Sequence, residues 1–308
     1  MKWQVKSAIQ NFISITPNPS RLNYFFQHNL SKRVPVNLEV FFDVVGYTLN
    51  HLNFFQKYCN SQNDSEARFY EFGAGWDLQI PLTFYALGIN HQTLIDIRPN
   101  IRFELINDMV NKFNSYHDRL ENKFKMPFRI FQKNALNNLN DLDKHFGIKY
   151  ISPLDAAKTG LPSKSFDFIS SSLVLEHIPA KDIESIFQEN QRLIKPDGII
   201  SCFIDLKDHY SESDKKINYY NFLKYPEWLW KLANSKIFFQ NRLRFPDYMQ
   251  IFNKVGFEII EYNCDEPKED DYKILKNMKL SKEFKNKYSN MELGIKLAWV
   301  VMRKTSNQ

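Results

Sequence analysis

The chain has 308 residues, 43% of them hydrophobic and 25% charged, with a formal net charge of +6, a size and balance typical of a globular protein with one large domain or one domain with additions. The basic excess is spread along the chain, and no stretch approaches the ~18 apolar residues that cross a membrane, so neither a nucleic-acid partner nor a membrane span is predicted. The three cysteines, Cys59, Cys202 and Cys264, lie far apart in the sequence, so no disulfide framework is predicted, and no metal-ligand spacing indicates a metal site. Together with an N-terminus that lacks a signal-peptide core, these features favour a cytoplasmic protein.

Residues 1–65 are predicted to form an N-terminal helical region. Within it, the segment Glu39–Tyr58 carries apolar residues at helical spacing, including Val45, Leu49 and Leu52. Residues at this spacing share one face of a helix, which would pack against the rest of the protein. The first strand of the core is expected directly after this region.

The segment Arg68–Phe72 is predicted to be a strand that ends in a tight turn. Its apolar run contains one carboxylate, Glu71, and is followed by three small residues: Gly73, Ala74 and Gly75. The glycines have no side chain to block a ligand and tolerate positive φ, so the turn can bring bare backbone against a nucleotide-like ligand. Glu71 would place an acceptor beside a cationic group of that ligand. The structural alternative is an ordinary glycine turn after a strand.

This turn departs from the dinucleotide-binding pattern G-x-G-x-x-G. The third glycine would stand at residue 78, which is Leu78, and a side chain there opposes the close packing of helix on strand. The run instead resembles the E-x-G-x-G opening of the class I S-adenosylmethionine (SAM)-dependent methyltransferases, although many members carry a further glycine where this chain has Asp77. The resemblance implies SAM as the cofactor. The residues that would hold its methionine part are Glu71, Gly73, Ala74 and Gly75.

Strands and helices alternate from residue 66 to residue 206, which we predict to be the SAM-binding core. After the first strand, further strands are expected at residues 93–97, 149–152, 166–170 and 199–206. Helices are expected at residues 78–87, 101–113, 136–146 and 183–193. The sequence Lys195–Gly198 is predicted to be a turn before the fifth strand. Apolar strands separated by helices indicate a parallel sheet covered on both faces.

Two aspartates follow predicted strands of this core. Asp96 lies at the carboxyl end of the second strand, where a carboxylate can accept two hydrogen bonds from a ribose diol; its alternative role is the N-cap of the next helix. Asp155 follows the third strand. The methyltransferase resemblance implies that Asp155 and the backbone N–H of Ala156 contact the adenine, while a turn-forming aspartate is the alternative.

The segment Leu161–Pro179 is the second run that carries the resemblance. It is similar to the L-P-x-x-S-F-D-x-x-x-S-x-x-V-L-E-H-I segment of small-molecule methyltransferases of type 11. A buried strand here ends in three serines, and the carboxyl ends of parallel strands form the ligand crevice of such sheets. We therefore expect residues 170–177 to line this crevice, with Ser171 at the cofactor and His177 as a candidate catalytic base.

The segment that follows the fifth strand contains a second candidate base, His209, because a neutral imidazole can take a proton near neutral pH. The alternative is a polar surface loop. Residues 207–250 form an aromatic insertion, which is predicted to be either a substrate lid or a small separate core. Arg242 and Arg244 within it are candidates for holding an acidic substrate group or, alternatively, for structural ion pairs.

Residues 251–308 are predicted to complete the methyltransferase fold. Strands at residues 257–262 and 295–302, with a helix at 248–255 before them, bring the count to the seven strands of class I methyltransferases. The predicted fold class is α/β, with a three-layer Rossmann-like sheet that is mostly parallel and has an antiparallel last strand. The stretch at residues 205–244 also resembles one found in uncharacterised bacterial methyltransferases of surface-polysaccharide gene clusters.

Three functions are compatible with these patterns. The favoured one is a SAM-dependent methyltransferase that transfers a methyl group to a small molecule or a glycan at oxygen, with His177 or His209 as the base. The second is a non-catalytic protein that keeps the fold for binding or assembly. The third, a nicotinamide oxidoreductase, is disfavoured by Leu78 and by the Leu161–His177 run. A nucleic-acid base is also disfavoured as the substrate, because the D-P-P-Y and N-P-P-Y motifs are absent.

Overall fold

The computed structural model describes residues 1–17, 19, 22, 24, 28, 34–59, 64–132, 135–235 and 238–305. The chain divides into two compact units. Unit 1 consists of Met1–Phe25, Ser172–Phe187 and Cys202–Thr305, and unit 2 consists of Phe26–Ser171, Gln188–Ser201 and Ser306–Gln308. Of the predicted N-terminal region, residues 18, 20, 21, 23, 25–27, 29–33 and 60–63 lie outside the described part. The units cut across the predicted division at residues 1–65, 66–206, 207–250 and 251–308, which stays a prediction.

A seven-stranded sheet has the strand order β3-β2-β1-β4-β5-β7-β6. Its strands are β1 (Arg68–Phe72), β2 (His91–Ile95), β3 (Ile148–Ile151), β4 (Phe166–Ser172), β5 (Ile194–Asp205), β6 (Phe257–Cys264) and β7 (Leu297–Lys304). The pairs β1–β2, β1–β4 and β2–β3 are parallel, and β6–β7 is antiparallel. The predicted fold class, a mostly parallel seven-stranded sheet with an antiparallel last strand, is confirmed.

Helices precede β1 and lie between most of the strands along the chain. They are α1 (Trp3–Ser14), α3 (Leu38–Tyr58), α4 (Gln79–Ala86), α5 (Phe103–Ser115), α6 (His117–Phe124), α7 (Leu139–Phe146), α8 (Ala180–Leu193), α9 (Glu227–Ala233), α10 (Phe245–Val255), α11 (Glu269–Asn277) and α12 (Asn290–Gly294). Within the described ranges, no helix is long and apolar enough to cross a bilayer.

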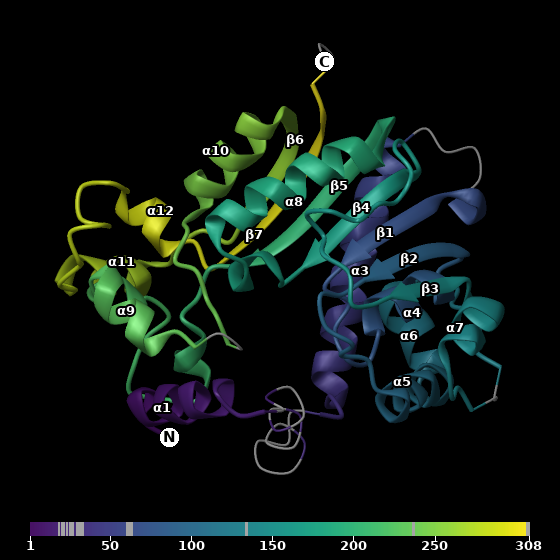
Figure 1. Cartoon of the computed structure of the whole chain (residues 1–308), viewed down its shortest axis with the longest axis horizontal. Coiled ribbons are helices and arrows are strands. Elements are labelled where there is room, and N and C mark those ends of the chain that lie inside the picture. The colour runs from purple at the N-terminus through teal and green to yellow at the C-terminus, as the bar shows by residue number, and fades with distance from the viewer. Residues whose placement is uncertain are drawn as a thin grey trace. The chain divides into compact units, whose positions relative to one another are not determined.

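In unit 2, helices α3 and α4 pack against β1 through aromatic rings (Figure 1). The Phe69 ring of β1 lies 4.9 Å from the Phe55 ring of α3 and 5.0 Å from the Phe84 ring of α4. Gly147, at the end of α7, has a φ of 64°, and a Cβ there would lie 1.7 Å from the carbonyl oxygen of Asn90. Only glycine fits this approach, so Gly147 fixes where the chain turns into β3.

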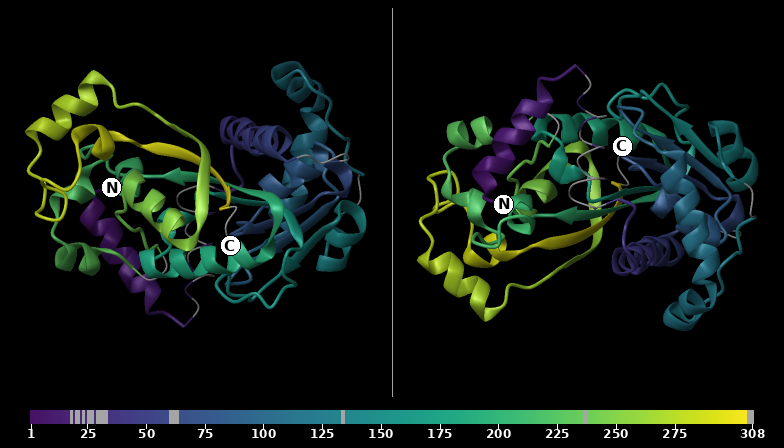
Figure 2. Two further views of the ribbon diagram at one scale, coloured as in Figure 1. Left: turned by 90° about the horizontal axis from the view of Figure 1, so that it is seen from above. Right: turned by 90° about the horizontal axis from the view of Figure 1, so that it is seen from below.

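In unit 1, α8 and α10 lie side by side and β6 runs along β7 (Figures 1 and 2). The rings of Phe187 and Phe252 are 4.5 Å apart. A salt bridge of 2.8 Å between Lys254 and Glu184 links the solvent sides of the same two helices. The ring contact buries apolar area between α10 and the first half of α8 and so stabilises their packing, whereas the exposed ion pair contributes little to stability.

The aromatic insertion forms a small core of its own in unit 1. Its buried members include Tyr210, Tyr220, Phe222 and Trp230, which cluster with Trp3 of α1. In Figures 1 and 2, α1 (purple) accordingly lies beside the green segment that carries α9. These side chains therefore serve packing, as the small-core interpretation predicts.

The turn predicted at Lys195–Gly198 is wrong, because β5 already begins at Ile194. The Lys195 ammonium pairs with Asp167 at 2.7 Å, and a Cβ at Gly198 would lie 2.8 Å from the Asp167 carbonyl oxygen. These contacts hold the segment extended against the start of β4. A proline in the strand is compatible with this because extended backbone suits its fixed φ.

Candidate functional site

Glu71 is a buried carboxylate with an unused acceptor. It sits in β1 and is 4% exposed, and its Oε2 atom has no hydrogen-bond partner among the described residues. Burial and the neighbouring Asp96 carboxylate raise the pKa of Glu71 to about 8. A buried oxygen without a donor is unfavourable in the empty protein, and a cationic ligand group would satisfy it.

The turn after β1 has the backbone that the glycine pattern predicts. Gly73 and Gly75 both have a φ of 79°, and the Gly73 N–H donates to the Ile95 carbonyl at 2.9 Å. A Cβ at Gly75 would meet no described heavy atom within 4 Å. The glycine is therefore required by its left-handed φ and leaves open space beside the backbone. Ala74, between the two glycines, is buried.

Leu78 stands where a dinucleotide fingerprint has its third glycine. Its φ is 53° and its ψ is 33°, in the left-handed region, and its side chain is fully buried in the unit 2 core. A leucine thus occupies a glycine-like conformation because its burial offsets the backbone strain of about 1 kcal/mol. The close helix–strand packing of a dinucleotide site is absent at this position.

Asp96 lies one residue after β2 and is buried. The Tyr150 hydroxyl donates to its Oδ2 atom at 2.9 Å, and the Leu154 N–H donates to its backbone carbonyl at 2.9 Å. Burial raises the pKa of Asp96 to about 7, and the Tyr150 hydrogen bond opposes that rise. The N-cap of α5 is Arg102, so the alternative role of Asp96 as a helix cap is wrong.

Asp155 and Ala156 lie in a turn after β3. The Asp155 side chain is exposed, and its Oδ1 atom accepts from the Ala157 N–H at 2.8 Å. That contact is the turn-forming one, which occupies one carboxylate oxygen. Ala156 is half-buried. Contact of either residue with an adenine stays a prediction.

The strand register places Ser170 beside Glu71. The two residues are partners in the parallel β1–β4 pair, so their side chains lie on the same face of the sheet, and Ser171 points to the opposite face. Both serine hydroxyls are buried without a partner in the described part of the chain. Ser170 lies in the segment expected to line the crevice, but the sequence analysis singled out Ser171 for the cofactor, since the register cannot be read from a run of three serines.

The two predicted catalytic histidines lie together in unit 1. Their ring centroids are 5.0 Å apart. His177 ends the 3₁₀ turn Leu175–His177, and its Nδ1–H donates to the Phe239 carbonyl at 2.9 Å, which leaves the Nε2 lone pair available. Burial and the neighbouring His209 lower the pKa of His177. Although part of the His177 residue reaches solvent, the ring is desolvated enough by its neighbours to be neutral near pH 7.

Glu176 joins this pair, and the sequence analysis did not name it. It is 2% exposed, and neither of its carboxylate oxygens has a hydrogen-bond partner among the residues that the structure describes. Burial raises the pKa of Glu176 well above its usual range, and the nearby backbone N–H groups of Glu176 and Asp205 only partly oppose it. Ligand atoms of Glu176, His177 and His209 lie within 4.8 Å of one another.

Asp205 faces the same cluster. Its Oδ2 atom lies 3.6 Å from His209 Nε2 and 3.1 Å from Lys207 Nζ. Burial acts to raise the pKa of Asp205, but His209 and Lys207 outweigh it and hold that pKa below its usual range. The carboxylate is thus ionised beside His209 at neutral pH.

Residues of the aromatic insertion brace the loops that carry the cluster. Gln240 accepts from the His209 N–H at 3.2 Å through its side-chain oxygen and donates from Nε2 to the Lys207 carbonyl. Asn241 donates from Nδ2 to the carbonyls of Leu175 and Ile178, each at 2.8 Å. The 3₁₀ turn with His177 and the loop with His209 are therefore held by one short segment.

The two arginines of the insertion have structural partners. Arg244 is fully buried and donates to the carbonyls of Leu206 at 2.7 Å, Leu293 at 2.9 Å and Ile295 at 2.5 Å. Arg242 pairs with Glu227 at 2.5 Å. These contacts fit the structural alternative of the sequence analysis.

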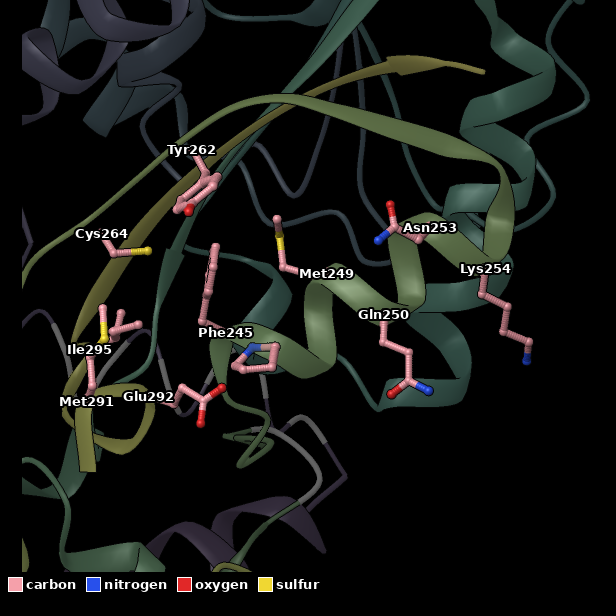
Figure 3. Close-up of a pocket in the computed structure, with 11 residues that line it drawn as sticks. Phe245, Met249, Gln250, Asn253, Lys254, Tyr262, Cys264, Met291, Glu292 and Ile295 are labelled. Carbon is pink, nitrogen blue, oxygen red and sulfur yellow. The ribbon is translucent and has the colours of Figure 1, made fainter. Parts of the chain in front are cut away.

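A cavity of about 880 Å³ lies between α10, β6 and α12 of unit 1 (Figure 3). The side chains of Phe245, Met249 and Tyr262 point toward one another there, while Lys254 projects away. Tyr262 is 60% exposed, so the cavity is an open apolar groove. None of the predicted site residues lines it.

The predicted site residues thus fall into two groups. In unit 2 the structure brings together Glu71, the glycine turn and Asp96, with Asp155 exposed in its own turn and Ser171 on the other sheet face. In unit 1 it brings together His177 and His209.

One family model matches part of the chain, and several solved structures are similar to it. The family described as "Methyltransferase domain" matches residues 131–202, which is less than half of the chain. No curated protein matches the sequence. Among solved structures, the chain is similar to the PH0226 protein from Pyrococcus horikoshii OT3, with 14% identity, 91% of this chain and 98% of that chain covered, and a TM-score of 0.49.

Two further structures are similar to this chain. One is a SAM-dependent methyltransferase from Methanosarcina mazei, with 14% identity, 81% and 95% of the two chains covered and a TM-score of 0.44. The other is a TehB-like SAM-dependent methyltransferase from Corynebacterium glutamicum, with 10% identity, 94% and 100% covered and a TM-score of 0.45. The match over residues 131–202 and the strand order of the sheet confirm the resemblance to the class I SAM-dependent methyltransferases.

Proposed function

We propose that this protein is a SAM-dependent methyltransferase that methylates a small molecule or a glycan at oxygen. The observation that carries the proposal is the buried Glu71 carboxylate, which has an unpartnered oxygen directly before a turn of two left-handed glycines. The match of residues 131–202 to the methyltransferase domain family supports it.

The residues present fit SAM. Glu71 would accept from the ammonium group of the methionine part, beside the open backbone of Gly75. Asp96 would accept from the ribose hydroxyls, and Asp155 with Ala156 would contact the adenine. Burial strengthens the hydrogen bonds of Glu71 and Asp96, because little water competes for these two carboxylates.

SAM supplies a methyl carbon on a positively charged sulfur, which leaves as a neutral thioether. The protein's share is to orient the acceptor, to exclude water and to accept the acceptor's proton. His177 suits the last task because its Nδ1–H is held by the Phe239 carbonyl and its Nε2 lone pair is available. His209, beside the Asp205 carboxylate, is the second candidate.

The proposal also includes the chemical class of the methyl acceptor. The resemblance expected from the sequence between residues 205–244 and methyltransferases of polysaccharide gene clusters would favour a sugar hydroxyl. A screen of nucleotide sugars and cell-surface oligosaccharides with radiolabelled SAM would identify the acceptor class by label transfer.

Calorimetric titration tests the proposal directly. We expect the protein to bind SAM and not NADH, and we expect Asp96→Ala to weaken SAM binding about tenfold or more, because the ribose loses charge-assisted hydrogen bonds. A matched control is Asp118→Ala, which removes an exposed carboxylate of α6. Binding of NADH alone would contradict the proposal, and an unchanged dissociation constant for Asp96→Ala would remove Asp96 from the site.

A further inference from the structure

We propose that Glu176, His177 and His209 bind a divalent first-row transition-metal ion such as Zn²⁺. The ligand atoms of these residues lie within 4.8 Å of one another. Atoms that share one such ion lie within about 4 Å of one another, because each bond is close to 2 Å long. Small side-chain rotations would therefore complete the set. No sequence spacing marks it, since Glu176 and His177 lie in the 3₁₀ turn after β4 and His209 lies beyond β5.

The Glu176 carboxylate is the observation that points to a ligand. It is almost completely buried, and among the described residues neither oxygen has a hydrogen-bond donor. Buried carboxylates in proteins are normally hydrogen-bonded, paired or bound to a metal. Its nearest titratable neighbours in the cluster are two imidazoles, which are metal ligands themselves.

The imidazoles are oriented as ligating histidines usually are. His177 donates its Nδ1–H to the Phe239 carbonyl, which leaves Nε2 as the coordinating atom. The Asp205 carboxylate lies 3.6 Å from His209 Nε2, which favours a proton on that nitrogen and leaves Nδ1 for the ion. The carbonyl behind His177 fixes the tautomer of that ring and increases its basicity as a ligand, whereas the Asp205 carboxylate is too far from His209 for a hydrogen bond and acts on that ring by its charge.

Neighbouring side chains hold the histidines of the cluster in position. Gln240 and Asn241 hold the two loops that carry the histidines through four hydrogen bonds of their side chains. His177 is exposed, so an ion and an oxygen ligand from outside can reach the cluster. Two imidazoles with one carboxylate suit Zn²⁺, Co²⁺ or Mn²⁺ better than Mg²⁺ or Ca²⁺, which prefer oxygen.

The role of the ion rests on the proposed methyl transfer but replaces its base, because His177 and His209 would coordinate the ion with the lone pairs that a base uses. An acceptor hydroxyl bound to a divalent ion has a lower pKa and loses its proton to water more readily. The methyl carbon would then move from sulfur to that oxygen, with the neutral thioether as the leaving group. This role narrows the acceptor to molecules that present an oxygen to the metal, such as a sugar diol or a hydroxy acid.

Co²⁺ titration of the full-length protein, without an added histidine tag and after treatment with a chelator, tests the site. We expect one equivalent of Co²⁺ to give visible absorption bands and Zn²⁺ to displace it. Glu176→Gln keeps the shape but removes the charge, and it should weaken Co²⁺ binding roughly tenfold or more, as should His209→Ala. Retained thermal unfolding transitions would show that both variants fold.

The control variants separate this site from other metal-binding groups. His145→Ala removes a histidine of α7 outside the cluster, and a Cys59→Ser/Cys264→Ser protein removes the two less buried thiols; both should bind Co²⁺ as the unaltered protein does. The inference is overturned if no equivalent binds, if Glu176→Gln and His209→Ala bind unchanged, or if the cysteine variant alone loses binding.

SAM titration distinguishes the failure of this inference from that of the proposed function. Glu176→Gln should bind SAM with an unchanged dissociation constant, because the SAM ligands are Glu71 and Asp96. Metal binding without SAM binding would contradict the proposed function but would still support the metal site. SAM binding without metal binding would contradict only the metal site.

Discussion

At the scale of single residues, the carboxyl group of Glu71 determines how the candidate cofactor site responds to pH. Its pKa of about 8 means that the group is mostly protonated in the ligand-free protein at pH 7. A ligand ammonium favours the ionised form, so binding must expel the proton. The neighbouring Asp96, with a pKa of about 7, responds in the same direction.

We therefore expect SAM binding at pH 7 to release about one proton from Glu71. Calorimetry in two buffers of different ionisation enthalpy measures this number. Glu71→Gln should reduce the release by about one proton and should weaken binding, since the amide cannot ionise. Equal proton release by Glu71→Gln and the unaltered protein would show that Glu71 does not meet the ligand's cation.

The same group makes the ligand-free protein less stable as pH rises. The pKa of Glu71 is raised from 4.5 to about 8 on folding, so between these values the folded state binds more protons than the unfolded state. The free energy of unfolding therefore falls with increasing pH through this window. The thermal unfolding midpoint should drop more between pH 6 and pH 9 for the unaltered protein than for Glu71→Gln. A parallel pH dependence of the two proteins would contradict this assignment.

The sequence predicted the buried acid and the glycine turn but not how the residues around them are partnered. Asp96 was recognised from its position after a strand, and its contact with Tyr150 came only from the structure. Residues 170–177 were expected to line the crevice, but Ser171 was chosen over Ser170, because the register of β1 on β4 decides which serine shares a face with Glu71. Glu176 was given no role of its own, because its burial depends on segments distant in sequence.

At the scale of elements, Arg244 ties three segments of unit 1 together. It donates to the carbonyls of Leu206, Leu293 and Ile295 after β5, within α12 and before β7. Burial lowers the pKa of Arg244 to about 10, so it remains charged at neutral pH. A planar guanidinium reaches several acceptors at once, which a lysine ammonium does not do with the same geometry.

Arg244→Met should therefore lower the free energy of unfolding by about 3 kcal/mol or more, because buried carbonyls lose their donors. Arg244→Lys should recover only a small part of that loss. Chemical denaturation measures both, with Lys276→Ala, which removes a lysine of the last turn of α11, as the control. A loss below about 0.5 kcal/mol for Arg244→Met, the range of ordinary surface changes, would show that the contacts do not stabilise the unit.

The sequence predicted the core strands to within a few residues because their apolar runs are continuous. The short helix α6 was not predicted, since Leu120 is its only buried residue and leaves no hydrophobic periodicity to detect. The early start of β5 was missed because proline and glycine in Lys195–Gly198 are typical of a turn, whereas contacts with Asp167 keep that stretch extended.

At the scale of the whole molecule, each compact unit is assembled from distant parts of the chain. In unit 1, the ring centroid of Trp3 in α1 lies 5.6 Å from that of Tyr210 and 5.2 Å from that of Tyr225. The backbone N–H of Trp3 donates to the Asp214 carboxylate at 2.9 Å. No local pattern in the sequence predicts a contact between residues that are more than 200 positions apart. The predicted N-terminal region therefore did not reveal that its first helix packs with the aromatic insertion.

Removal of the Trp3 side chain tests this long-range packing. Trp3→Ala should lower the free energy of unfolding by about 3 kcal/mol, because it empties a buried aromatic site. Phe12→Ala, on the same helix, changes a residue that is 66% exposed and should have little effect. Equal effects of the two substitutions in denaturant titrations would mean that α1 does not stabilise unit 1.

The central claim is that the carboxylate and glycine turn after β1 bind the adenosyl cofactor. A crystal structure of the protein with S-adenosylhomocysteine, the product of methyl transfer, tests it most directly. We expect the ligand's amine within hydrogen-bond distance of Glu71, its backbone contacts at Gly73–Gly75 and its ribose at Asp96. A ligand bound elsewhere, with the Glu71 carboxylate still without a partner, would contradict the account.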